Sequence, residues 1–173
     1  MKIKAHKIKI ASLAALTTIT SLLVMSGCAT SQPGLVLDPV GPPPGLSSGG
    51  ETTGSLVVFS AFDPTGIHGM DRQAHTSYKI LSGDGKLLQN VRNDPGNMVG
   101  GPTSVQLPAG GYHVVARANG YGLVTVPVVI LGGKVTVVHL EGGGSWPDRS
   151  QMIQVGAVRL PDGRVVGWRA TAE

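Results

Sequence analysis

Hydrophobic and polar residues alternate along residues 103–141. Alternation with a period of two is typical of a β-strand with one buried face, because successive side chains of a strand point to opposite sides of the sheet. We expect strands over residues 112–119 and 123–131, and a returning strand over 135–140 after a Gly-Gly turn. Pro127 has no backbone N–H to donate, so it predicts an edge strand or a bulge at its position.

The same pattern extends upstream. Residues 54–62 are apolar and β-branched on both faces, which suits an inner strand of a sheet. Residues 75–81 and 86–91 flank an Asp-Gly pair that is typical of hairpin turns. Short strands separated by turn residues, with 26 Gly and 12 Pro in the chain, favour strands over helices. We therefore predict an all-β fold, a single small antiparallel β-sandwich of the prealbumin or immunoglobulin-like kind, over residues 54–142.

The C-terminal region, residues 143–173, predicts a glycine-rich joint followed by one β-hairpin around a Pro-Asp-Gly turn at 161–163. An isolated hairpin is marginally stable in water, so this one must pair with an edge of the sandwich, a partner or another copy of itself. Trp146 and Trp168 are candidate apolar anchors for that docking. They fit an exposed binding surface or, as the preferred interpretation, a plain contribution to the core.

The N-terminal residues 1–27 have the three zones of a secretory signal peptide: a lysine-rich start, an apolar middle and small residues at the end. The apolar run is too short, and too rich in Thr and Ser, for a comfortable membrane span, which needs about 20 apolar residues. The sequence Val-Met-Ser-Gly-Cys that ends at Cys28 resembles the bacterial lipobox. The alternatives are an ordinary signal peptide with an incidental cysteine, or an uncleaved anchor.

The lipobox resemblance implies that the sulfur of Cys28 carries a lipid and that Cys28 becomes the new N-terminus. Cys28 is the only cysteine of the chain, so it cannot form an internal disulfide. By the sorting habit of lipoproteins, Ala29 in the next position favours the outer membrane. We therefore expect a protein of the bacterial cell envelope, anchored in the membrane by lipid and facing the periplasm or the exterior.

Residues 28–53 predict a disordered tether rich in Pro, Gly and Ser, because this composition buries too little apolar surface to offset the entropy of ordering. Three consecutive prolines at 42–44 should form a short polyproline II segment. Such a tether would hold the domain a few tens of ångströms from the bilayer. The apolar patch at 35–37 is the exception, and it can dock on the domain or on lipid.

The formal net charge of +4 does not indicate a nucleic-acid partner. Four of the 14 Lys and Arg residues lie in the leader, so the remaining 10 balance the 10 Asp and Glu residues. The mature chain is then close to neutral and has no basic footprint for nucleic acid.

No sequence motif indicates catalysis. The chain has no G-x-S-x-G nucleophile elbow, and its only cysteine is assigned to lipidation. One loop carries a weaker metal hypothesis, because Asp63, His68, Asp71 and His75 offer two nitrogen and two carboxylate ligands within a short stretch. Their spacing matches no helical or zinc-finger motif, so solvated loop residues are the preferred interpretation. We expect no enzymatic activity and no cofactor.

The segments LPAGGYHVVARANGYG and VTVPVVILGGKVTVVHLE resemble the second half of a carboxypeptidase-regulatory-like (transthyretin-like) or PEGA-type sandwich domain. The resemblance covers residues 54–142 and is specific over 107–140. The chain departs from it by lacking the Pro-Glu-Gly-Ala signature and by carrying longer loops after Asp63 and Asn93. The resemblance implies a fold and a non-catalytic accessory role, and it carries no active-site residues over to this chain.

These observations favour a lipid-anchored accessory, structural or binding module of the cell envelope, with an envelope protein or polysaccharide as its partner. The first alternative is a carbohydrate- or polymer-binding domain that assists an envelope enzyme or transporter. The second alternative is a metal-dependent enzyme that uses the loop from Asp63 to His75.

Overall fold

All regular secondary structure in the described part of the chain is β-strand, so the fold is all-β, as the alternation predicted. The chain separates into two units, residues 1–30 and 31–173, and all described residues belong to the second. In the part of the chain that the structure describes, no helix has the length and apolar character needed to cross a membrane. The computed structural model describes residues 34–44, 50–63, 74–93, 101–142 and 156–171.

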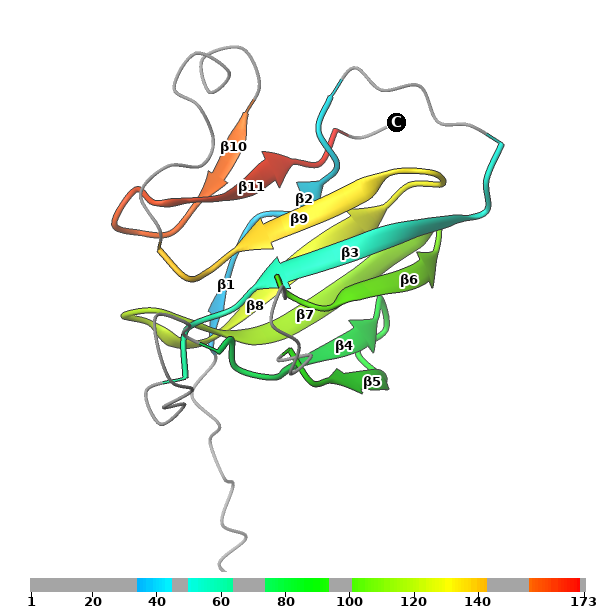
Figure 1. Ribbon diagram of the computed structural model, residues 1–173. Coiled ribbons are helices and arrows are strands. Elements are labelled where there is room, and N and C mark those ends of the chain that lie inside the picture. Colours follow the sequence, from blue (N-terminus) through cyan, green and yellow to red (C-terminus); the bar gives the residue numbers. More distant parts are fainter. Residues whose placement is uncertain (1–33, 45–49, 64–73, 94–100, 143–155, 172–173) are drawn as a thin grey trace, which may run out of the picture. The chain divides into compact units, whose positions relative to one another are not determined.

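The larger sheet, sheet A, has eight strands in the order β10-β11-β2-β8-β7-β4-β5, with β1 also paired to β8 (Figure 1). Its centre is the hairpin of β7 and β8, which pair antiparallel over their full length from Gly110↔Ile130 to Ala118↔Gly122. The strands of sheet A are β1 (Leu35–Val36), β2 (Val40–Gly41), β4 (Tyr78–Ser82), β5 (Leu87–Val91), β7 (Gly110–Ala118), β8 (Gly122–Ile130), β10 (Ala157–Arg159) and β11 (Val165–Arg169).

The smaller sheet, sheet B, has the order β6-β3-β9. Its central strand pairs antiparallel with β6 and parallel with β9. The strands of sheet B are β3 (Thr53–Phe59), β6 (Ser104–Pro108) and β9 (Val135–His139).

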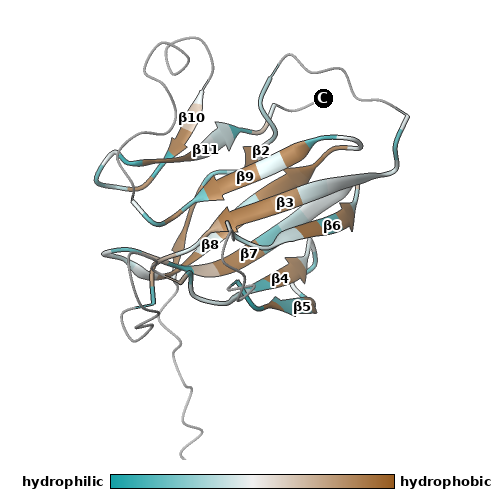
Figure 2. Cartoon of the chain, viewed as in Figure 1, coloured by the Kyte–Doolittle hydropathy of each residue, from teal (hydrophilic) through white to brown (hydrophobic). Residues whose placement is uncertain are grey.

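One hydrophobic core is built from the inward side chains of both sheets. Alternate residues of β7 and β8 point inward, and most of the other residues of these strands lie in partly exposed positions. Figure 2 shows the resulting hydrophobic stretches along the strands. Burial of each Val, Leu or Ile side chain contributes about 1.5–3 kcal/mol, so this core is the main source of stability. Its largest fully buried members are Val40, Leu56, Val58, Ile80, Val114, Val124, Val126, Val128, Ile130, Val138, Leu140 and Val158.

The two sheets are compatible with a β-sandwich, but both are mixed, so the prediction of purely antiparallel pairing is not confirmed. The strand at 135–140 does not return beside β8 as expected. It crosses to sheet B and pairs parallel with β3, with Val137 opposite Val57. The Gly-Gly pair allows this crossing because a Cβ added at Gly132 would lie 1.7 Å from the backbone oxygen of Glu51. Gly132 therefore serves a close backbone approach, and Gly133, at a φ of 69°, lies in a tight turn in which the N–H of Lys134 donates to the oxygen of Leu131 at 3.1 Å. This turn connects two sheets rather than two strands of a hairpin.

The expectation of a disordered tether is wrong for residues 34–44. Leu35 and Val36 pair parallel with Val124 and Thr125 of β8, and Val40 pairs parallel with Val128 farther along the same strand. Leu37 of the apolar patch therefore docks on the domain at 9% exposure, as does the fully buried Val40, whereas Val36 of the same patch is 63% exposed. Tertiary burial of these few apolar side chains overrides a composition that is typical of disorder.

Pro127 lies inside the sheet, not on an edge strand, because β8 has neighbours on both sides. On one side it is opposite His113 of β7. On the other side it falls between the pairing of Thr125 with β1 and the pairing of Val128 with β2. The missing N–H of proline thus coincides with the break between the two short N-terminal strands.

The C-terminal hairpin forms as predicted and joins sheet A. Its strands β10 and β11 pair antiparallel, and β11 continues the sheet by pairing with β2 at Trp168↔Gly41 and Arg169↔Val40. A Cβ added at Gly167 would lie 2.4 Å from Cγ1 of Val40, so the close packing of β11 on β2 requires glycine there. The C-terminal hairpin thus reaches β8 through the N-terminal segment.

Candidate functional site

Three strand ends meet at one end of the fold, which we call the hairpin-tip end: the ends of β3 and β9, and the turn from β7 into β8. Backbone hydrogen bonds join them. The N–H of Ala61 donates to the oxygen of Arg117 at 2.8 Å, and that of Leu140 to Phe59 at 2.7 Å. The N–H of Asn119 donates to the oxygen of Leu140 at 2.9 Å. The side chains of His75, His139, Glu141 and Arg164 gather here.

Two histidines and two phenylalanines stack in a row at the hairpin-tip end. Phe59 and His139 are register partners on β3 and β9, and their rings are parallel within 8° at a centroid distance of 4.5 Å. His75 meets Phe59 edge-on at 5.7 Å and stacks on Phe62 at 5.1 Å. Ring pairs of this kind contribute about 0.5–1.5 kcal/mol each beyond their burial. The row therefore fastens the ends of the strands together.

Glu141 completes this row. Its Oε1 atom lies 2.8 Å from Nδ1 of His139, and the two side chains are 13% and 12% exposed. Its Oε2 atom is buried and has no hydrogen-bond partner within the described structure. A carboxylate can orient an imidazole for proton transfer, as in hydrolytic triads. Here Phe59 stacks on one face of the imidazole, so the ring and the carboxylate together fix the orientation of His139.

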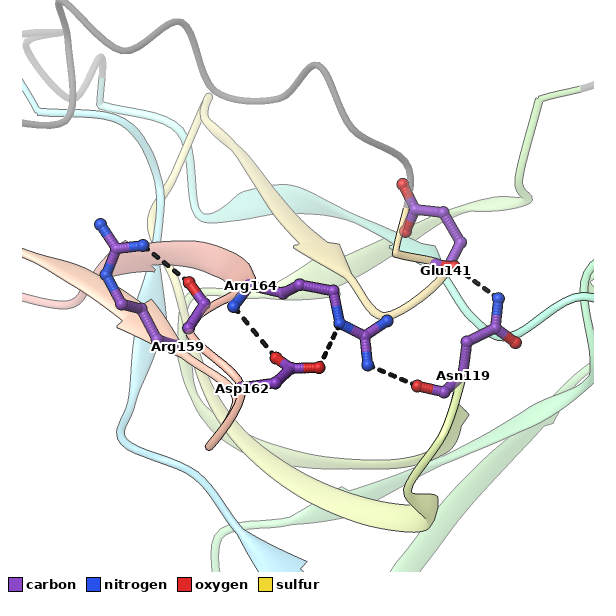
Figure 3. A network of polar contacts seen from close by, with 6 residues as sticks. Asn119, Glu141, Arg159, Asp162 and Arg164 are labelled. Atoms are coloured by element: carbon purple, nitrogen blue, oxygen red, sulfur yellow. Dashed lines mark hydrogen bonds and ion pairs between the residues drawn. The ribbon is translucent and has the colours of Figure 1, made fainter.

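Arg164 ties the C-terminal hairpin to the hairpin-tip end (Figure 3). Its Nη2 atom donates to the backbone oxygen of Asn119 at 2.6 Å, and its Nε atom donates to Oδ2 of Asp162 at 2.6 Å. Its guanidinium carbon lies 5.6 Å from the centre of the Tyr121 ring. The side-chain amide of Asn119 in turn donates to the backbone oxygen of Glu141. The Arg164 network thus joins β11, the β7–β8 turn and the end of β9.

A buried amide holds the neighbouring segments in place. Asn93 is 1% exposed, and its Nδ2 atom donates to the backbone oxygen of Val58 at 2.8 Å and to the hydroxyl of Ser60 at 2.9 Å. Its Oδ1 atom accepts from the N–H of Thr103 at 3.0 Å. A buried amide with all these partners fixes one backbone arrangement, because any alternative leaves polar groups unpaired.

The metal hypothesis gains no support from the two ligands that the structure describes. Nδ1 of His75 lies 2.6 Å from the backbone oxygen of Ser60, and its ring stacks on Phe62 and meets Phe59 edge-on. The N–H of Asp63 donates to the oxygen of Ala74 at 2.7 Å, which closes the base of the loop. His68 and Asp71 lie outside the described residues. Within the described ranges, no group of three or more His, Cys, Asp or Glu side chains can hold a metal ion.

The remaining candidates divide in the same way. Cys28 and Trp146 lie outside the described residues. Trp168 is 7% exposed on β11, beside Gly41 of β2, which agrees with its interpretation as a core residue.

Comparison with protein-family models, with curated proteins and with solved structures gives no match to this chain.

The Arg164 network and the Asn93 amide are absent from the sequence-based candidates. The contacts that join distant segments have no local signal, because Asn119 is 45 residues from Arg164 and Val58 is 35 residues from Asn93. The sequence signal at Arg164 is limited to its place after the Pro-Asp-Gly turn, where Asp162 accepts from its backbone N–H at 3.1 Å.

Proposed function

We propose that this protein is a lipid-anchored, non-catalytic binding or accessory module of a bacterial cell envelope, held in the membrane through Cys28. The observation that carries the proposal is the N-terminal leader of residues 1–27, which ends in a lipobox-like sequence at the only cysteine of the chain. The lipid would be the membrane contact, and the β-fold would be the part displayed to partners.

The start of the fold supports a short connection to the membrane. Strand β1 begins at Leu35, and Gly34 already lies beside β8, where its Cβ position is 3.1 Å from the oxygen of Leu123. Six residues from Cys28 to Gly34 span at most about 20 Å when fully extended. The domain would therefore sit close to the bilayer surface, rather than a few tens of ångströms away.

The use of the polar side chains supports a non-catalytic role. At the hairpin-tip end, His75 and His139 contact a backbone carbonyl and a carboxylate, and their rings pack on phenylalanines. Arg164 bridges two turns by hydrogen bonds. These contacts stabilise strand ends, and they leave these groups committed to the structure rather than directed at a substrate.

We also propose that the two sheets form a sandwich of the carboxypeptidase-regulatory-like kind, which in that family is an accessory fold. The support is local: residues 107–140, where the resemblance is specific, form the end of β6 and strands β7, β8 and β9 in succession. The parallel pairing of β8 with the N-terminal segment is an addition to that plan.

Neither alternative function is favoured by a specific observation. A sugar-binding platform needs exposed aromatic rings, and every Phe, Tyr and Trp in the described ranges is buried or only partly exposed. The metal-dependent enzyme would need the loop histidines to converge, and His75 is engaged with Ser60.

The anchor is tested by metabolic labelling of cells with a clickable palmitate, comparing the wild type with Cys28→Ser. We expect label and membrane fractionation for the wild type, and loss of both for Cys28→Ser. A Ser26→Ala variant is the matched control, because it keeps the thiol and the small residue before it. Equal labelling of the wild type and Cys28→Ser would overturn the proposal.

A further inference from the structure

The exposed large hydrophobic side chains of the described structure form two groups at opposite ends of the fold. Val36 and Leu123 are 63% and 58% exposed, and both lie near the hairpin-tip end. Leu87, Leu88 and Val135 are 47%, 50% and 45% exposed. They lie toward the other end, because β4 and β5 meet β7 near its start and β9 begins there.

Val36 and Leu123 share the outer face of sheet A. Val36 is the register partner of Thr125 on β8, and Leu123 precedes Thr125 by two residues on the same strand. Residues two apart on a strand point to the same side, and diagonal neighbours on adjacent strands lie about 7–8 Å apart. The two aliphatic side chains therefore form one small apolar patch.

Exposed cations flank this patch. Arg117 is the register partner of Leu123 on β7 and is exposed, and Lys79 of β4 is exposed opposite Val115 of the same face. The outward positions of β4, β7 and β8 carry no acidic residue. The nearby carboxylate of Asp38, on the segment between β1 and β2, is paired with Arg169 at 2.8 Å. An apolar patch bordered by basic side chains matches the interface of an anionic bilayer.

The first residue that the structure describes, Gly34, lies at this same place. Gly34 lies against the backbone oxygen of Leu123, so the described chain begins beside the patch. Since the six residue steps from Cys28 to Gly34 span at most about 20 Å, a lipid on Cys28 would keep the patch at the membrane surface.

We propose that the outer face of sheet A at the hairpin-tip end, formed by Val36, Leu123 and Arg117, rests on the phospholipid bilayer that holds Cys28. This inference rests on the proposed lipid anchor and adds to it an orientation of the domain. The aliphatic side chains enter the boundary between headgroups and acyl chains, and the guanidinium of Arg117 binds lipid phosphate. The opposite end, with β5 and the start of β9, then points away from the membrane and is available to partners.

The test uses the full-length acylated protein in vesicles of phosphatidylcholine and phosphatidylglycerol that carry a nitroxide near the headgroup. Acylation occupies the sulfur of Cys28, so Leu123→Cys introduces a single reactive thiol for a bimane label. Leu88→Cys, on the exposed strand β5, is the matched control with similar exposure. We expect quenching of the label at position 123 to exceed that at position 88 several-fold. Arg117→Glu should reduce the quenching at position 123 in the anionic vesicles.

Mass spectrometry of the same samples separates the two proposals. Acylated protein with equal quenching at both positions, or with stronger quenching at position 88, overturns the docking while the anchor stands. Absence of the acyl mass overturns the anchor, and the docking with it. The accessibility of the label at position 123 to water is also compared between detergent and vesicles. If the label is as inaccessible in detergent as in vesicles, and becomes less accessible as the protein concentration rises, a second copy of the chain covers the patch. That result also overturns membrane docking.

Discussion

Strand β8 has two flanks that are held in very different ways. On one side β7 pairs with it over nine residues, antiparallel and through a short turn. On the other side β1 and β2 pair with it in parallel, β1 through two register pairs and β2 through one. The first flank is a local hairpin, whereas the second closes a connection of more than 80 residues. Strand β7 can therefore pair with β8 through local contacts alone, whereas β1 and β2 can pair with β8 only once the core has formed.

The difference matters because the C-terminal hairpin is attached to the weaker flank. Strand β11 is paired to β2, so the C-terminal hairpin depends on the N-terminal segment for its place in sheet A. The Arg164 network adds a second fastening at the hairpin-tip end. Stability is then expected to be graded, with the β7–β8 hairpin at the top and the β2–β11 seam below it.

The largest effect is expected from Val126→Asp, at the centre of the strong flank. Val126 is fully buried opposite Val114, so the substitution places an unpaired carboxylate in the core. We expect loss of more than about 4 kcal/mol and failure of the whole domain to fold, measured by circular dichroism and thermal unfolding. Thr125→Asp, the adjacent residue with an outward side chain, is the control and should keep the fold. Cooperative unfolding of Val126→Asp at the wild-type temperature would contradict the assigned core.

A smaller and more local effect is expected at the β2–β11 seam. Gly167→Ala places a methyl group against Cγ1 of Val40, and also 3.0 Å from the backbone oxygen of Val137. We expect a loss of about 1–3 kcal/mol, with faster amide exchange in the C-terminal hairpin and unchanged exchange in β7 and β8. The double variant with Val40→Ala makes room for the methyl group. It should be more stable than the sum of the two single changes predicts. Strict additivity, or exchange that speeds up equally in β7, would contradict a separate seam.

The two flanks also mark how much of the fold was predictable from the sequence. The all-β class, the β7–β8 strands and the C-terminal hairpin have local signals: alternation along the strand and glycine or Asp-Gly turns. The pairing of Leu35–Val36 and Val40–Gly41 has none, because two-residue strands show no period and their Pro-rich surroundings favour disorder. The parallel pairing of β3 with β9 depends on contacts between residues that are distant in sequence, so the residues of the turns do not predict it.

The candidate residues follow the same division. Trp168 is buried, whereas Trp146, the other candidate anchor, lies outside the described residues. The neighbours of His75 in sequence make it a weak candidate metal ligand, whereas its contacts in the structure are Ser60 and two phenylalanines on other segments. Asn93 and Arg164 acquire their roles only from the partners that the fold brings to them. Proximity along the chain is a poor guide to chemistry when the strands that carry it are joined across two sheets.

The smallest expected effect is a pH dependence of the C-terminal hairpin. Desolvation raises the pKa of Asp162, but hydrogen bonds from the backbone and side chain of Arg164, together with its charge, outweigh it, and the net shift is downward. A carboxyl whose pKa is lower in the folded state stabilises that state above its unfolded pKa, near 3.9. This contribution is lost as the pH falls through the folded pKa. Asp162 is exposed, so the loss is local rather than global.

We therefore expect the amide of Gly163, which donates to the oxygen of Leu160 at 2.9 Å, to lose protection from exchange in acid. Asp162→Asn should remove the pH dependence of this protection relative to the other amides of the domain. Asp84→Asn is the matched control: the pKa of Asp84 is also lowered, chiefly by the hydroxyl of Ser82, but at the turn between β4 and β5. If Asp84→Asn abolished the acid sensitivity of Gly163 and Asp162→Asn did not, the Arg164 network would not be what fastens this hairpin to the weaker flank of β8.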